Sequence, residues 1–150
     1  MSALFAFLHH LGAFAVVAAL AVKFVLLRGE LTLERARQLR VADAVYGVAA
    51  GFVVVVGLLR VFYFEKGAAY YFHSVPFIAK LSLIVAVGLL SIIPTLEFAS
   101  WRKPLREGRA PAVSASRLRT LQRIVHWEAA GVVFILLAAA LMARGVGYLG

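Results

Sequence analysis

Cysteine is absent from the 150-residue chain, which excludes disulfide bonds, thiolate metal sites, cysteine nucleophiles and covalent haem attachment through a CxxCH motif. Charge is scarce as well, because Asp, Glu, Lys and Arg make up 15% of the residues while hydrophobic types make up 63%. Soluble domains carry about 25% charged residues. Here the charges come in short blocks between long uncharged runs, a pattern typical of membrane spans. We therefore expect a membrane protein in which any metal is held by His, Met or carboxylate side chains.

Four apolar runs account for most of the chain, at about residues 4–27, 41–64, 76–101 and 121–143. About 20 helical residues cross a hydrocarbon core of ~30 Å, and every run reaches that length. A membrane barrel would instead show segments of ~10 residues with alternating polarity. The first run has no basic region before it and three more runs follow it, so we do not expect a cleaved signal peptide. The sequence predicts an all-α fold, a single transmembrane four-helix bundle over residues 1–150.

The basic residues between the runs predict the orientation of the bundle. Four arginines lie in residues 28–40, and seven of the sixteen Lys and Arg lie between Trp101 and Ile124. The remaining connection, residues 65–75, has a single Lys. The positive-inside rule therefore places both termini on the outer face of a bacterial inner membrane. The same basic loops, beside an anionic bilayer, explain the net charge of +9, so we expect no nucleic-acid partner.

Small residues mark one face of the second run. Gly47 and Gly51 form a GxxxG frame, with Ala44 and Ala50 close by. Such spacing lets another helix or a flat ligand approach the backbone, and helix packing is the simpler interpretation. The frame favours a homo-oligomer. The two halves of the chain share no motif, which argues against an inverted-repeat transporter.

Ionisable side chains inside the spans are the most informative residues, since each costs about 2.5–3.5 kcal/mol at the bilayer centre. Counting ~1.5 Å of rise per residue sorts them into two layers. The outer layer, with one member on the outer connection, consists of His9, His10, Arg60, Lys80 and His73. These groups repel one another unless an anion joins them, and the only nearby carboxylate is Glu65 at the rim.

Haem b suits the outer layer. Imidazole ligates iron, Arg and Lys pair with propionates, and the neighbouring Phe and Val side chains supply an apolar slot. We predict His10 as the axial ligand, with Arg60 and Lys80 holding propionates or an anionic tetrapyrrole. The alternative is that His9 is an ordinary interfacial residue and that Arg60 extends to the headgroups.

The inner layer carries both signs of charge and consists of Lys23, Asp43, Glu97, His126 and Glu128. Mutual ion pairing is the simplest interpretation, and a proton relay or a carboxylate–His metal site is the alternative. His126 and Glu128 are two residues apart and point to different sides of the helix, which weakens the metal interpretation. The depths of His10 and His126 differ by roughly 15–20 Å, so one iron cannot be ligated by both.

Several segments resemble a family of uncharacterised bacterial four-helix membrane proteins over nearly the whole chain. They are Phe7–Gly12, Leu59–Gly67, Phe77–Leu83 and Leu90–Thr95. More distantly, about half of the chain is similar to HemJ-type protoporphyrinogen oxidases, which bind haem b. That similarity rests on a His near the start of the first helix, matched by His10 or His9, and on an Ala-Lys-Leu triplet, matched at Lys80. The further basic and Trp signatures of those oxidases have no counterpart, and Arg28 matches their first-helix Arg only loosely.

Together the residues and the resemblance predict a haem b-binding membrane redox protein. It would pass electrons from a substrate, such as a tetrapyrrole, to quinone, with protons leaving through Asp43 or His126. A second hypothesis is a small oligomeric transporter of ions or solutes that uses the inner layer as a relay. A third is a structural or assembly subunit, in which the buried charges tolerate neutral replacement.

Overall fold

The computed structural model describes residues 2–64 and 68–147, and these residues are almost entirely helical. The elements in chain order are α1 (Ser2–Leu26), α2 (Leu33–Leu59), the π-helix η1 (Arg60–Phe64), α3 (Ala68–Phe72), α4 (Val75–Ser100), α5 (Arg102–Arg106) and α6 (Ala115–Ala143). Within the described residues, four helices are long and apolar enough to cross a membrane. The predicted all-α membrane fold is confirmed.

Two of the long helices, α2 and α6, begin well before the apolar runs from which they were predicted. Thr32 caps α2, its hydroxyl accepting a hydrogen bond of 3.2 Å from the Arg35 amide, and Ser114 caps α6 in the same way through Arg117. Such caps satisfy amides that the first helical turn leaves free. The arginine-rich segments next to the apolar runs are therefore helical rather than loop.

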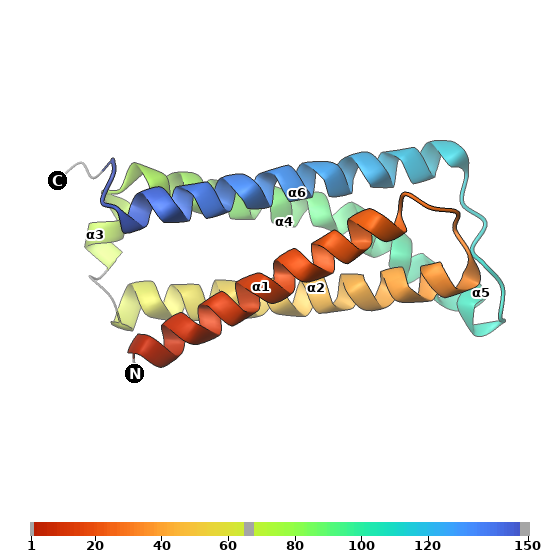
Figure 1. Cartoon of the computed structure of the whole chain (residues 1–150), viewed down its shortest axis with the longest axis horizontal. Coiled ribbons are helices and arrows are strands. Elements are labelled where there is room, and N and C mark those ends of the chain that lie inside the picture. Colours follow the sequence, from red (N-terminus) through yellow and green to blue (C-terminus); the bar gives the residue numbers. More distant parts are fainter. Residues whose placement is uncertain (1, 65–67, 148–150) are drawn as a thin grey trace.

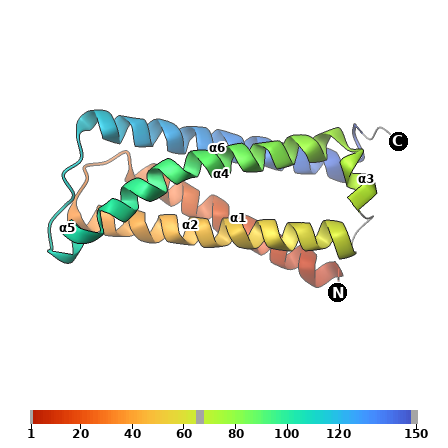
Figure 2. The same cartoon turned by 180° about the vertical axis from the view of Figure 1, so that it is seen from behind.

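The four long helices form two hairpins, α1 with α2 and α4 with α6 (Figure 1). The start of α1, the end of α6 and α3 lie at one end of the bundle, which we call the terminal end. The α1–α2 loop and α5 lie at the other, which we call the basic end. Between these ends α1 and α4 run diagonally, and the view from behind shows the same course (Figure 2). The hairpins consequently meet in the basic half and diverge in the terminal half.

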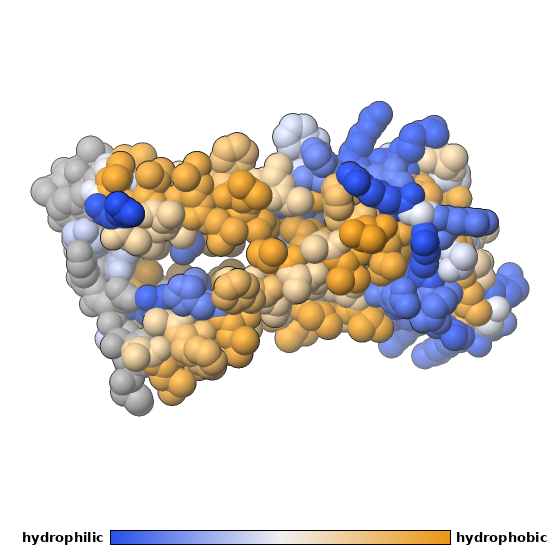
Figure 3. Space-filling view, in the orientation of Figure 1, coloured by the Kyte–Doolittle hydropathy of each residue, from blue (hydrophilic) through white to orange (hydrophobic). Residues whose placement is uncertain are grey.

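The buried core follows this geometry. Its largest apolar cluster lies in the basic half and draws on α1, α2, α4, α5 and α6. Members include Leu27, Leu39, Phe98, Trp101 and Leu121. The surface is apolar over most of the length of the bundle, and polar side chains gather at the basic end (Figure 3). In the terminal half the same view shows an opening between the two hairpins.

Close helix approaches occur at glycines outside the GxxxG frame. A Cβ on Gly12 would lie 2.6 Å from Val53 Cγ2 of α2, and a Cβ on Gly131 would lie 2.4 Å from Val87 Cγ2 of α4. Gly47 and Gly51 face open space, with no atom of the described chain within 4 Å of such a Cβ. Among the described residues, no other helix therefore packs on the side of the GxxxG frame where these two Cβ atoms would lie.

Candidate functional site

His9 lies between α1 and α2 in the terminal half. Its ring packs against the α2 backbone, because a Cβ on Gly57 would come within 3.1 Å of Cε1 and 3.4 Å of Nδ1. Nδ1 is buried, and no described group forms a hydrogen bond of normal geometry with it, although the Val53 backbone lies beside the ring. Gly57 thus makes room for a half-buried imidazole at this point of the bundle.

Two cationic side chains lie close enough to this imidazole to act on its charge. Arg60 and Lys80 both act electrostatically on His9, and they also act on each other. Arg60 stands where α2 changes into the π-helix η1, and such π segments recur at functional sites. Lys80 comes from α4, across the gap between the hairpins. Three elements that are distant in sequence thus bring His9, Arg60 and Lys80 together, and we call them the terminal cluster.

The other expected outer residues are placed differently. His10 and His73 are exposed, and each Nδ1 lies within hydrogen-bonding distance of a backbone carbonyl four residues earlier, at 2.6 Å for Ala6 and 2.7 Å for Ala69. Glu65, the carboxylate expected at the rim, lies outside the described residues. The structure therefore places His9, and not His10, on the buried side of α1.

A second cluster lies inside the basic half. Lys23 Nζ is 2.7 Å from Asp43 Oδ1 and 3.7 Å from Glu128 Oε2. Lys23 and Glu128 are 0% exposed, and Asp43 is 7% exposed. The ammonium also lies 4.4 Å from the centre of the Tyr46 ring, a cation–π contact. We call Lys23, Asp43 and Glu128 the buried triad.

The charges of the buried triad do not balance, because one ammonium faces two carboxylates. Both Glu128 oxygens are buried without a described hydrogen-bond partner, and Lys23 is closer to Asp43. An uncompensated charge in such surroundings costs several kcal/mol, on the order of 3–5. Binding one proton removes that cost, so the arrangement can hold and release a proton inside the bundle.

Glu97 and His126 do not belong to the triad. Glu97 pairs with Arg117 Nε at 2.7 Å and accepts a hydrogen bond from Trp101 Nε1 at 3.2 Å. His126 is exposed and stacks beside Phe24, with ring centres 6.2 Å apart. Among the residues that the structure describes, no three His, Asp or Glu side chains gather as a metal site. A carboxylate–His metal centre therefore has no counterpart in the described inner layer.

Sequence reasoning did not single out Tyr46 or Gly57. Tyr46 follows Asp43 by three residues, and this spacing puts both side chains on the same face of α2. That spacing was a usable signal for the tyrosine. No sequence signal marked Gly57, because its role depends on the His9 ring, which another helix contributes.

These features define a multi-pass membrane protein with ionisable side chains inside a four-helix bundle. The family model described as "Predicted membrane protein (DUF2214)" matches residues 1–147, and the chain belongs to this family. The expected resemblance to a family of uncharacterised membrane proteins is thereby confirmed. No curated protein and no solved structure matches the chain.

Proposed function

We propose that the protein is a haem b-binding membrane redox protein and that the terminal cluster holds the haem. The observation that carries this proposal is the half-buried imidazole of His9, flanked by Arg60 and Lys80 in the half of the molecule where the hairpins diverge. His9 replaces His10 as the proposed axial ligand, because His10 is exposed.

The chemistry of the terminal cluster fits this group. Haem supplies an iron that cycles between two oxidation states, and it requires an imidazole donor, cationic partners for two propionates and an apolar slot. His9 provides the imidazole. Arg60 and Lys80 provide positive charge from two separate elements, and the neighbouring α1 and α2 surfaces are apolar.

The buried triad adds a place for the proton that accompanies electron transfer. Asp43 and Glu128 share one cation, so a proton added to the triad neutralises an excess negative charge. In this role Lys23 fixes the position of Asp43, and Tyr46 packs against the ammonium. A tetrapyrrole dissolved in the bilayer is the proposed electron donor, and quinone is the proposed acceptor.

Reconstitution with haem tests the terminal cluster. We expect detergent-purified protein to bind added haem with a Soret band that shifts on reduction, and the His9→Ala variant to lose this band. The matched control is His10→Ala, which changes the same residue type one position along and should keep the band. A wild-type protein that stays colourless, or equal loss in both variants, contradicts the assignment.

A second candidate function is proton-coupled transport, and the buried triad is the observation that favours it. Four helices seldom enclose a pore alone, so this function requires an oligomer. We expect proteoliposomes under an imposed pH gradient to show proton flux that Asp43→Asn abolishes. The control is Glu97→Gln, because Glu97 lies apart from the triad and pairs with Arg117. Absence of flux in the wild-type protein counts against transport.

A further inference from the structure

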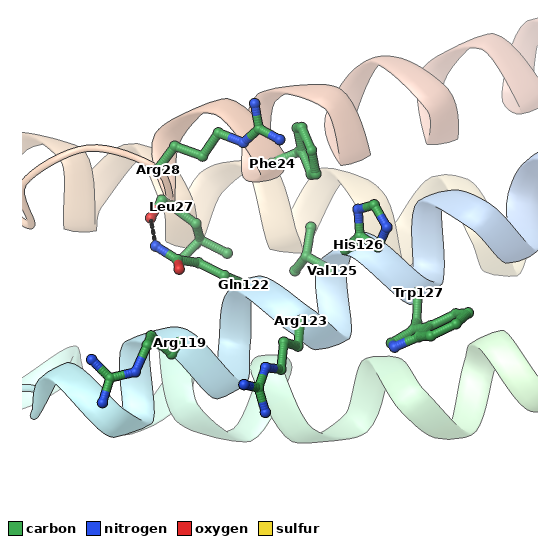
Figure 4. A pocket seen from close by; sticks show the side chains of 9 residues that line it. All are labelled: Phe24, Leu27, Arg28, Arg119, Gln122, Arg123, Val125, His126 and Trp127. Carbon is green, nitrogen blue, oxygen red and sulfur yellow. Dashed lines mark hydrogen bonds between the residues drawn. The ribbon is translucent and has the colours of Figure 1, made fainter.

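A cleft of about 370 Å³ lies at the basic end, between the last turn of α1 and the first turns of α6 (Figure 4). One wall carries Phe24 and Arg28, and the other carries α6 side chains. Its lining residues are Phe24, Leu27, Arg28, Arg119, Gln122, Arg123, Val125, His126 and Trp127. This cleft is separate from the terminal cluster and from the buried triad.

The charge of the cleft is entirely positive. Arg28, Arg119 and Arg123 line it, and no carboxylate does. Two other arginines at this end have acidic partners, since Arg117 pairs with Glu97 and Arg109 with Glu107. Within the described chain the three cleft arginines form no ion pair. Figure 4 shows the Arg28 guanidinium on the α1 side of the cleft and the Arg119 and Arg123 guanidinium groups on the other side of α6. Positive charge that no described carboxylate pairs with therefore lies on both rims of the cleft.

Between the two rims the lining is apolar (Figure 4). Phe24, Leu27 and Val125 form this part of the lining, and the guanidinium of Arg28 lies 4.1 Å from the Phe24 ring centre. Gln122 donates a hydrogen bond of 2.6 Å to the Leu27 carbonyl, which ties α6 to the end of α1. The cleft is thus cationic at the edge and apolar within, and a hydrogen bond between its two walls fixes their spacing.

The position of the cleft matches the headgroup level of a bilayer. Arg28 lies two residues after the end of the apolar α1 helix, whereas Arg119 and Arg123 lie before the apolar part of α6. Trp127 is 65% exposed just beyond them, and tryptophan is enriched at membrane interfaces. A ligand here has its anionic part among the arginines and its apolar part along the helices.

We propose that this cleft binds an anionic phospholipid through the phosphodiester of its headgroup. Arginines recognise phosphate oxygens by charge-assisted hydrogen bonds, and basic pockets between membrane helices are suited to anionic lipid headgroups. A zwitterionic lipid is a poorer ligand, since its ammonium group finds no carboxylate in the cleft. Free phosphate is poorer too, because it leaves the apolar walls uncovered. The site is independent of haem binding.

The test compares lipids and variants on the delipidated full-length protein in a neutral detergent. Native mass spectrometry and thermal unfolding are measured with phosphatidylglycerol, phosphatidylcholine and inorganic phosphate. We expect saturable binding of phosphatidylglycerol with a raised Tm, and much weaker effects of the other two. The proposal is overturned if the wild-type protein binds phosphatidylcholine as tightly as phosphatidylglycerol. It is also overturned if inorganic phosphate raises the Tm as much as phosphatidylglycerol does.

Variants then locate the site. Arg28→Gln/Arg119→Gln/Arg123→Gln removes the three cleft charges and should weaken phosphatidylglycerol binding on the order of a hundredfold. The control variant, Arg37→Gln/Arg102→Gln/Arg106→Gln, removes three exposed charges at the same end but outside the cleft. Circular dichroism verifies that both variants keep their helix content. Equal weakening in the two variants shows diffuse attraction to the basic end and overturns the specific site.

Discussion

Replacing Lys23 by methionine is expected to destabilise the bundle by about 3–5 kcal/mol at neutral pH, because it leaves two buried carboxylates without their shared cation. Methionine is similar in length to the lysine stem, so little packing is lost and the effect reports on charge. Lys23 Nζ sits 2.7 Å from Asp43 and 3.7 Å from Glu128, so both acids lose their nearest cation. Chemical unfolding in detergent, followed by circular dichroism, measures the change.

Two comparisons separate charge from shape in the Lys23 experiment. The triple variant Lys23→Met/Asp43→Asn/Glu128→Gln removes every charge of the buried triad and should recover most of the lost stability. Lowering the pH should also reduce the loss of stability in Lys23→Met, since protonation neutralises the two buried carboxylates that have lost their cation. The exposed Lys103→Met is the control, with a change within about 0.5 kcal/mol. If Lys23→Met is as stable as the wild type at neutral pH, the triad does not hold the two negative charges and one positive charge inferred above.

The second large effect is expected at Gly131, where α6 approaches α4. In Gly131→Ala the new Cβ would lie 2.4 Å from Val87 Cγ2, and Val87 is buried and β-branched, so its side chain has little freedom to turn away. Overpacking of this kind costs about 1–3 kcal/mol. Thermal unfolding of the purified protein provides the measurement.

The matched control for Gly131 is Gly88→Ala on the facing helix α4. A Cβ on Gly88 meets no atom of the described chain within 4 Å, so this variant should be neutral or slightly stabilising. Adding Val87→Ala to Gly131→Ala should restore part of the lost stability, because it removes the colliding methyl groups. Equal Tm values for Gly131→Ala and Gly88→Ala would show that the α4–α6 contact is looser than the structure has it.

The four helices and their approximate ends could be predicted because apolar length is a property of consecutive residues. The apolar runs do not show where α2 and α6 begin, since arginine-rich turns after Thr32 and Ser114 extend each helix before its apolar part. The small helices α3 and α5, five residues each, were not predicted either. Their segments are short, and no apolar run of membrane length marks them.

The depth of each ionisable residue along the bundle could also be predicted from the sequence. The direction in which its side chain points around the helix axis could not. Residue counting put Lys23, Asp43 and Glu128 at one level, and the structure joins them. The same counting put Glu97 and His126 at that level, yet they face elsewhere. Direction depends on which neighbour each helix packs against, and a single sequence does not contain that information. The choice between His9 and His10 required the same knowledge.

The divergence of the two hairpins determines how a ligand would arrive. The opening in the terminal half reaches the apolar surface of the bundle between α1–α2 and α4–α6 (Figure 3). In a bilayer, acyl chains and not water would border that surface. A ligand of the terminal cluster would therefore enter sideways, by diffusion in two dimensions. Its concentration in the leaflet, rather than in the aqueous phase, would determine how often the site is filled.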